Sequence, residues 1–438
     1  MSQPSLKLTM IGPSGTGKSC YLYATYFRML EGVAGFNFNC VNVNQALALE
    51  EAWNAILDDG VWPAGTGEGG EEFRFSCKHN GGQIGDFTWL DYRGGLLNET
   101  ASEGSDLTHF LNRAVDSDAI LVCLPADVLL TAQANDLRVQ RRWARMKNEI
   151  LRILGAIYRR NDAASLVFMI TKSDLCKSQE EGRLCVEAIR TAFQQYFTGT
   201  PEYAMITASR LGRFEGGTDD FQQGAEIKGV LDPHNVHLPI LLPFWVNACR
   251  AKMELNGAQA EYARENANFN WASTLKERGE KLDSAGDKIN CGAILLLFLG
   301  GVVGVGLQNR TWLILWMLLL FAGAIWANIL GYKGQKLKDA APSDYDLGKM
   351  RRQLEGKAER VRVLYAAAAI PTDAIWRELN GRVELYRNGK KILSAAGSSQ
   401  DAPSVPTSNR ETSFVRMLGA ATKLFGKHTS VGANSIRN

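Results

Sequence analysis

Apolar runs of strand length alternate with helical periodicity through the first half of the sequence. Residues 6–11, 119–124 and 166–170 are apolar-rich and have the length of buried strands. Between the last two runs, apolar side chains recur every three or four residues, which predicts one long helix over 128–158. Strands that alternate with helices predict an α/β domain with a mostly parallel sheet over residues 1–250.

The pattern changes after this domain. Residues 251–288 are polar and helix-prone, which predicts a helical stalk. Residues 289–307 and 312–330 are apolar and carry no charge, so at ~1.5 Å per residue each is just long enough for a hydrocarbon core of ~30 Å. Only residues 308–311 separate them, so the two spans must run antiparallel as a transmembrane hairpin. The alternative is a buried core hairpin of a soluble protein.

The charges around this hairpin predict its orientation. Basic residues flank it on both outer sides: Lys276, Arg278, Lys281 and Lys288 come before it, and Lys333, Lys336 and Lys338 come after it. Because cytoplasmic flanks carry the excess of Lys and Arg, both outer ends are expected in the cytoplasm. The sequence therefore predicts an integral protein of the inner or plasma membrane, with lipid as a partner.

The last third of the chain is expected to be helical and then irregular. Apolar positions between 347 and 365 repeat at three and four residues, like one face of a coiled coil. Pro371 ends that pattern and a second amphipathic segment follows, so 331–394 is predicted to be a cytoplasmic helical region. Residues 395–438 begin with a Ser-, Gly- and Pro-rich stretch, which predicts a disordered tail with an amphipathic helix over 414–427.

Composition excludes some classes of protein. The net charge of +3 over 438 residues gives no sign of the concentrated basic patch of a nucleic-acid binder, so no nucleic-acid partner is expected. The eight cysteines show neither CxxC pairs nor zinc-site spacing, which predicts reduced thiols in a cytosolic domain. The N-terminus lacks the pattern of a cleavable signal peptide.

A glycine-rich turn follows the first predicted strand and fits GxxxxGK(S/T) in full. Its sequence is Gly12-Pro13-Ser14-Gly15-Thr16-Gly17-Lys18-Ser19. Glycines in such a turn let backbone N–H groups point at phosphate oxygens, and a helix that begins at Lys18 directs its positive end to the same anion. Lys18 is expected to pair with the β- and γ-phosphates, and the Ser19 hydroxyl to bind Mg²⁺.

A second motif follows a predicted hairpin formed by residues 72–78 and 86–91. It is Asp91-Tyr92-Arg93-Gly94, in which the acid holds Mg²⁺ and Gly94 offers its N–H to a γ-phosphate. Alone, DxxG is as well explained by an ordinary turn.

Two further motifs follow later strands. In Thr171-Lys172-Ser173-Asp174, the carboxylate of Asp174 accepts two N–H bonds from the guanine edge, a pair of donors that adenine lacks, while Lys172 lies along the base. In Thr207-Ala208-Ser209, a backbone N–H meets the guanine oxygen.

In this order and spacing, the four motifs resemble those of the Ras-like GTPases of the TRAFAC class. Trp62-Pro63-Ala64-Gly65-Thr66 is similar to the WPxGT stretch of a prokaryotic subgroup of that class, which is often associated with bacterial defence. The resemblance covers about residues 5–250. It implies a P-loop GTPase domain, with GTP and Mg²⁺ as ligands and Thr66 as the switch threonine on the metal.

The resemblance also assigns roles to individual residues. Catalysis is expected from Lys18, Thr66, Asp91 and Gly94. Mg²⁺ is expected on Ser19, Thr66 and Asp91. The nucleotide is expected on Gly12, Ser14, Gly15, Thr16, Gly17, Lys18, Ser19, Cys20, Thr171, Lys172, Asp174, Ala208 and Ser209. One departure concerns Gly95, which stands where Ras-like enzymes often place a water-orienting Gln, so hydrolysis is expected to be slow or to need an activating partner.

Several functional hypotheses remain open at this point. The chain is a nucleotide switch that hydrolyses GTP, a dynamin-like mechanochemical membrane protein that self-associates, a nucleotide-gated scaffold without hydrolysis, or a P-loop ATPase. Two other features have a plain and a functional explanation. The arginines of 138–152 form either a solvated face or a docking face for lipid or a partner, and His234 and His237 are either structural residues or a metal pair.

Overall fold

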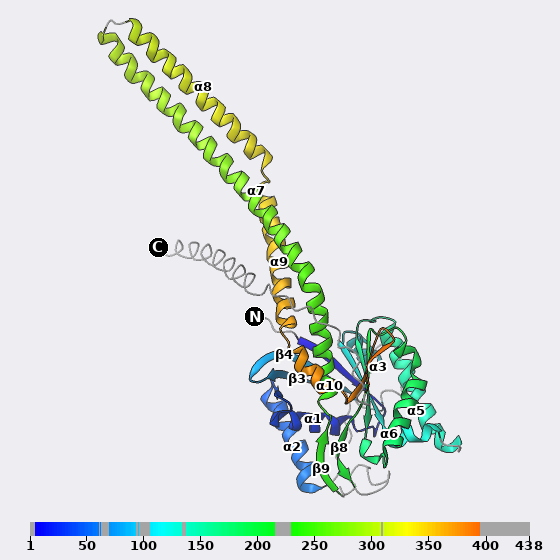
Figure 1. Cartoon of the computed structure of the whole chain (residues 1–438). Helices are drawn as coiled ribbons and strands as arrows, with labels where there is room; N and C mark the ends of the chain where they lie inside the picture. The colour runs from blue at the N-terminus through cyan, green and yellow to red at the C-terminus, as the bar shows by residue number, and fades with distance from the viewer. Residues whose placement is uncertain are drawn as a thin grey trace.

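The computed structural model describes residues 5–60, 62, 70–92, 95, 106–133, 137–214, 229–307 and 310–394. An α/β domain forms one end of the molecule, and a long helical rod leads away from it (Figure 1). Thr66, Gly94 and the tail 395–438 lie outside the described residues.

A mixed sheet of nine strands forms the centre of the α/β domain, in the order β11-β10-β7-β6-β5-β1-β4-β3-β2. Its five central strands run parallel: β1 (Ser5–Ile11), β4 (Gly82–Tyr92), β5 (Ala119–Pro125), β6 (Ser165–Thr171) and β7 (Tyr203–Ala208). The antiparallel strands β3 (Gly70–His79) and β2 (Phe36–Cys40) extend one edge, and β3 and β4 form the predicted hairpin.

Helices cover both faces of this sheet. The helices α1 (Lys18–Glu31), α2 (Val43–Asp59), α3 (Asp106–Val115), α4 (Ala126–Leu129) and α6 (Gln179–Ala192) alternate with the strands along the chain. On β5, Leu121 packs into one core with α1, whereas Ile120 and Val122 pack into a second core with α3, α6 and the helix α5 (Leu137–Tyr158). Because such strands are buried on both faces, they appear in the sequence as continuous apolar runs.

The helix predicted over 128–158 is interrupted near its start. A 3₁₀ turn, η2 (Leu130–Gln133), follows α4, and α5 covers Leu137–Tyr158. The hydroxyl of Thr131 donates to the carbonyl of Val128 at 2.6 Å, and such side-chain bonds to the backbone compete with the helical ladder.

The C-terminal segment returns to the sheet, which the sequence did not predict. Residues 331–394 were expected to be helical, but 383–393 form the hairpin β10 (Val383–Arg387) and β11 (Lys390–Leu393). β10 pairs antiparallel with β7, and α10 (Thr372–Leu379) precedes it. Residues from both ends of the sequence therefore build one sheet.

Three helices form the rod. α7 (Leu238–Leu307) has 70 residues and is ~105 Å long, and α8 (Arg310–Ala340) and α9 (Asp344–Ala368) return along it. α7 is continuous across both expected boundaries, 250 and 288, and its first residues lie in the core of the α/β domain. α7 and α8 approach closely, since a Cβ on Gly286 would lie 3.1 Å from the carbonyl oxygen of Ala327 and from the nitrogen of Gly331.

The distal part of the rod is apolar and exposed. Trp316–Ala340 is the one stretch, among the described residues, long and apolar enough to cross a membrane, and 17% of its most apolar window is buried. Most side chains of the first expected span, 289–307, are not described, and neither are residues 308–309.

Candidate functional site

The glycine-rich loop lies between β1 and α1, at the carboxyl end of the central strand. Gly15 and Gly17 have φ of +76° and +85°, the left-handed region that favours glycine, and no described heavy atom lies within 4 Å of a Cβ built on either. Gly12 is constrained differently, because a Cβ there would lie 2.8 Å from Thr16 Oγ1 and 3.0 Å from the Cys123 carbonyl oxygen. The loop is thus packed against β5 at its base and open at its tip, where Ser14 and Gly15 are exposed.

Lys18, the first residue of α1, lies buried beneath this loop. Its Nζ donates to the carbonyl oxygens of Gly12 at 2.8 Å and Pro13 at 3.1 Å. These bonds use two of the three donors of an ammonium group. Burial lowers the pKa of Lys18, and the negative charge of nearby Asp91 opposes that shift. The charge is therefore held at the loop, where an anion would stabilise it.

Ser19 and Asp91 supply a hydroxyl and a carboxylate on the same side of the sheet. Ser19 is the second residue of α1, and Asp91 lies at the end of β4, paired in register with Met10 of β1. Asp91 is only 3% exposed, and its charge acts on Lys18. Hydroxyl and carboxylate oxygens are ligands of the kind that Mg²⁺ takes from proteins. Thr66, the third expected ligand, lies outside the described residues.

The segment Thr171-Lys172-Ser173-Asp174 is fastened to the glycine-rich loop. Thr171 Oγ1 donates to the carbonyl oxygen of Thr16 at 2.8 Å, and both residues are buried. Thr171 was expected to bind the nucleotide, and in the structure its hydroxyl holds one loop against the other. Lys172 follows in a left-handed conformation, with φ of +52°.

The fourth motif joins the same cluster through the backbone. Ser209 N donates to the Ile170 carbonyl at 2.9 Å, and Ser173 N donates to the Ser209 carbonyl at 3.4 Å. Ala208, the last residue of β7, pairs with Ile170 and is exposed. The structure therefore brings together the glycine-rich loop, the segment 171–174 and the segment 207–209, which are far apart in the sequence.

Asp174 has an unsatisfied acceptor in this cluster. Its Oδ2 is buried and has no hydrogen-bond partner among the described residues. Burial raises the pKa of Asp174, and the positive charges of Arg210 and Lys172 oppose that shift. A buried acceptor without a donor is costly, so a ligand that brings N–H groups to this oxygen gains affinity.

Two charged residues at this cluster were not predicted from the sequence. Arg210 directly follows Ser209, acts on Asp174 and lies 3.6 Å from Asp232. Asp127 opposes the burial that lowers the pKa of Lys172, and it pairs with Arg142 at 3.3 Å. The only sequence signal was proximity to a motif or to the end of a strand. The sequence placed Arg142 on a basic helix face. Its ion pair with Asp127 means that part of this face contacts the protein itself.

The segment between β9 (Gly229–His234) and α7 touches the cluster and the helices around it. Ser209 Oγ donates to the carbonyl of Asn235 at 3.2 Å, and the Tyr21 hydroxyl of α1 donates to the carbonyl of Val236. His237 is buried, and its Nε2 lies 3.2 Å from Glu378 Oε2. Among the described residues no group of three His, Cys, Asp or Glu suits a metal, and the contact with Glu378 gives His237 a structural role.

Trp62 begins the WPxGT segment and is anchored on β8 (Arg210–Phe214). Its ring lies 5.2 Å from that of Phe214, edge to face, and it is 8% exposed. Gly95, after DxxG, is exposed, and a Cβ there would meet no described atom within 4 Å. The structure therefore describes Trp62, at the start of the segment that contains Thr66, and Gly95, directly after DxxG. Thr66 and Gly94, the residues expected to sense a γ-phosphate, are not described.

A scan of the sequence against protein-family models finds no match, and a search of curated proteins finds none either. Function is therefore inferred from the geometry of the cluster formed by the glycine-rich loop, Lys18, Asp91 and Asp174. Its parts are a buried cation beneath an open glycine-rich loop and a buried carboxylate acceptor fixed to that loop.

Proposed function

We propose that this chain is a membrane-anchored GTP-binding protein with a Ras-like P-loop domain, which hydrolyses GTP to GDP with Mg²⁺ and acts as a nucleotide switch. The observation that carries the proposal is the Thr171–Thr16 hydrogen bond of 2.8 Å. It fixes the buried acceptor Asp174 at a set position relative to the loop above Lys18. A ligand that satisfies both ends carries an anionic group and an N–H donor for Asp174 Oδ2, and GTP has both.

The phosphates are the part of GTP that the glycine-rich loop accommodates. Backbone N–H groups at the start of α1 and the positive end of that helix favour an anion at this position. The ammonium of Lys18, two of whose donors hold the loop carbonyls, offers its charge and third donor to the β- and γ-phosphates.

Asp174 is the residue that selects the base. Its carboxylate has acceptors only when ionised, so it pairs with N1–H and N2–H₂ of guanine, whereas adenine presents an acceptor at N1. Rejection of analogues that leave buried polar groups unpaired often reaches several kcal/mol. This favours GTP over ATP and supports a GTPase over the ATPase alternative.

The donor set at Ser19 and Asp91 fits Mg²⁺. When bound, the ion offsets negative charge on the β- and γ-phosphate oxygens. Ser19 is the second residue of α1, which follows β1, and Asp91 lies near the carboxyl end of β4, the strand beside β1. Thr66 completes the proposed set.

Hydrolysis by the isolated chain is expected to be slow. Gly95 has no side chain with which to orient a water molecule, so that role falls to a group elsewhere, such as one from a second copy or an activating protein. The same observation supports a second candidate function, a nucleotide-gated scaffold that binds GTP without turning it over.

The rod supports the membrane part of the proposal. Large apolar side chains of α8 are exposed, among them Met317, Phe321 and Trp326, and exposed apolar patches of this extent mark membrane or protein contacts. A core helix of a soluble protein would be largely buried, whereas the most apolar window of Trp316–Ala340 is 17% buried. We propose that 289–307 and 312–330 cross the membrane as a hairpin, with the α/β domain and the C-terminus in the cytoplasm.

The decisive experiment measures binding and turnover of GTP and ATP by the full-length protein in detergent, across a range of protein concentrations. A preference for GTP over ATP supports the proposal, together with a fall of at least tenfold in GTP affinity or turnover in Lys18→Ala, because that variant loses the cation beneath the loop. A preference for ATP would contradict it. Turnover per molecule that rises with concentration would favour the self-associating, dynamin-like alternative, and tight GTP binding without turnover would favour the scaffold.

A further inference from the structure

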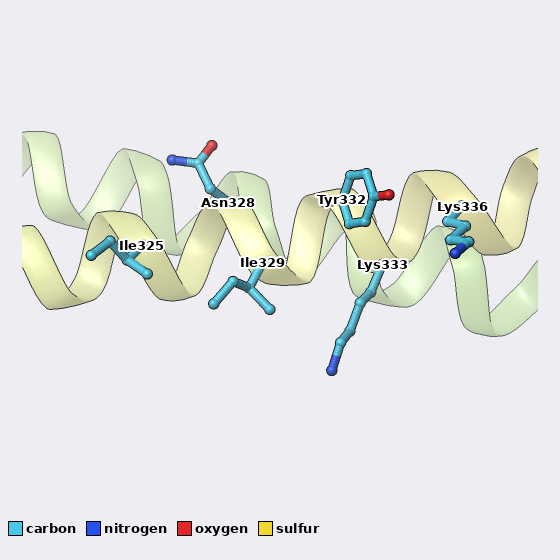
Figure 2. Close-up of a pocket in the computed structure, with 6 residues that line it drawn as sticks. All are labelled: Ile325, Asn328, Ile329, Tyr332, Lys333 and Lys336. Carbon is cyan, nitrogen blue, oxygen red and sulfur yellow. The ribbon is translucent and has the colours of Figure 1, made fainter.

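One face of α8 forms an open pocket of ≈ 610 Å³ (Figure 2). Its lining changes in character along the helix, from apolar through aromatic and amide to cationic. The lining residues are Ile325, Asn328, Ile329, Tyr332, Lys333 and Lys336. Nothing in the nucleotide proposal uses this face.

The pocket lies opposite the contact between α8 and α7. Ala327, Gly331 and Gly334 approach the backbone of α7, whereas residues 325, 329, 332 and 336 lie about half a turn away on a helix of 3.6 residues per turn. Figure 2 agrees with this, since α7 passes behind α8 while the labelled side chains lie around the front. The face is therefore available to a ligand from outside the rod.

The lysines of this face differ from their neighbour on the contact side. Lys338 faces α7 and pairs with Asp283, which compensates its charge. Lys333 and Lys336 are exposed and make no ion pair with any described residue. The pocket consequently ends in two uncompensated positive charges.

Apolar groups lie at one end of this face and cationic groups lie at the other, which matches the two ends of an amphiphilic molecule. Ile325 and Ile329 are 46% and 37% exposed, and the helix rises ~16 Å between residues 325 and 336. Tyr332 lies between the two isoleucines and the two lysines and is 69% exposed. Tyrosine is favoured where apolar surface meets polar surface. A ligand that fits must have an apolar chain at one end and a negative group at the other.

We propose that this face binds an anionic phospholipid of the cytoplasmic leaflet, with its phosphate at Lys333 and Lys336 and an acyl chain along Ile325 and Ile329. The inference rests on the proposed membrane hairpin and is independent of the nucleotide. The charge complementarity names the ligand, because a zwitterionic lipid brings its own cation to the same place and gains less from the two lysines. The site would favour anionic lipid around the base of the hairpin.

Lipid selectivity of the full-length protein tests the proposal. Native mass spectrometry in an uncharged detergent would compare phosphatidylglycerol with phosphatidylcholine of the same acyl chains. Since a basic residue near an anionic surface contributes about fivefold in affinity, we expect the wild type to prefer phosphatidylglycerol at least ~tenfold. Lys333→Gln/Lys336→Gln should reduce that preference to about twofold or less.

Lys349→Gln is the matched control for charge. Lys349 is exposed on α9, makes no ion pair with a described residue, and is not among the residues that line the pocket. It should leave the preference unchanged. Ile329→Ala should weaken both lipids alike, since it shortens the apolar part of the site without changing its charge.

Three outcomes would overturn the proposal. They are equal binding of both lipids by the wild type, an equal loss in Lys349→Gln, and displacement of the lipid by millimolar inorganic phosphate, which would indicate a plain anion site. Binding of fluorescent GTP by the same samples keeps the two proposals separate. Lipid preference without GTP binding would support this site alone, and GTP binding without lipid preference would leave only the nucleotide proposal.

Discussion

His237 Nε2 lies 3.2 Å from Glu378 Oε2, and this contact joins the residue before α7 to the last turn of α10. α7, which leads from the α/β domain into the rod, begins directly after His237, and the chain returns from the rod at α10. A second contact connects the same two segments, since Lys252 Nζ donates to Thr372 Oγ1 at 2.8 Å. Departure and return of the chain are thus fastened together beside the segment that also touches Ser209.

Glu378→Gln should destabilise the α/β domain in a pH-dependent way. The hydrogen bond from His237 and the charge of Arg382 lower the pKa of Glu378 below its ordinary 4.5. A lowered pKa contributes stability that is present above the unfolded pKa and is lost as pH falls through the folded value. Wild-type thermal stability should therefore fall as pH drops below 4.5, and less steeply in the variant.

At neutral pH the same variant should lose roughly 1.5–3 kcal/mol, the range for hydrogen bonds to charged groups. Thermal unfolding of the full-length protein in detergent measures both effects. Arg382→Gln is the control, because Arg382 lies in the turn between α10 and β10 with a partly exposed side chain, and ion pairs of this kind contribute roughly 0–1 kcal/mol. Equal losses in the two variants would show that the His237 contact adds nothing of its own.

Asp174→Asn should shift base preference from guanine toward xanthine. The amide replaces one acceptor with a donor, which pairs with the O2 of xanthine where guanine has its amine. We expect GTP affinity to fall and XTP affinity to rise, each by tenfold or more, about 1.4 kcal/mol. Competition binding of GTP, ATP and XTP to both proteins measures this. A variant that loses GTP without gaining XTP would mean that Asp174 supports the loop but does not contact the base.

Gly95→Gln should accelerate GTP hydrolysis. No described atom lies within 4 Å of a Cβ at this position, so the first carbon of a side chain meets no described residue. A glutamine there is able to orient the attacking water, and we expect a single-turnover rate at least about tenfold above wild type. Gly95→Ala controls for the backbone change and should not accelerate the reaction. If both variants match the wild type, water is positioned from another element.

Cysteines introduced on either side of the proposed hairpin should differ in their reaction with an impermeant reagent. Asn309→Cys, in the short connection between the spans, should label from outside intact cells, and Ser398→Cys should label only after lysis. The unsubstituted protein, with its eight native cysteines, gives the background. Labelling of Ser398→Cys alone in intact cells would rule out the cytoplasmic placement of the C-terminus.

The sequence predicted those parts of the fold that depend on local patterns. Runs such as 119–124 and 166–170 are apolar because both faces of their strands are covered. The turn at Gly15 and Gly17 has left-handed backbone angles that favour glycine, and the sequence has glycine at both positions. Both features lie within a few residues of their causes, so periodicity and composition were enough to place them.

The C-terminal hairpin depends on distant partners, and no local pattern revealed it. β10 has five residues, pairs with β7 about 180 positions earlier, and places Glu384 in a nearly buried position against Arg190 of α6. A short apolar run that contains a carboxylate has the sequence pattern of an amphipathic helix. Only the pairing of Glu384 with the distant Arg190 shows that this carboxylate is buried beside a strand. The roles of Arg210 and Asp127 could not be predicted for the same reason, because they depend on which strands are neighbours in the sheet.

The pairing of β10 with β7 also fixes the order in which the molecule is completed. A chain is synthesised from its N-terminus, so β7 leaves the ribosome long before α7, α8 and α9, and β10 leaves after them. Until then β7 presents an open strand edge, which is prone to pair with other chains. That edge stays exposed to other chains while the rod is made. The sheet reaches its final width only after α7, α8 and α9 have been produced, so the α/β domain is completed last although its first strand is made first.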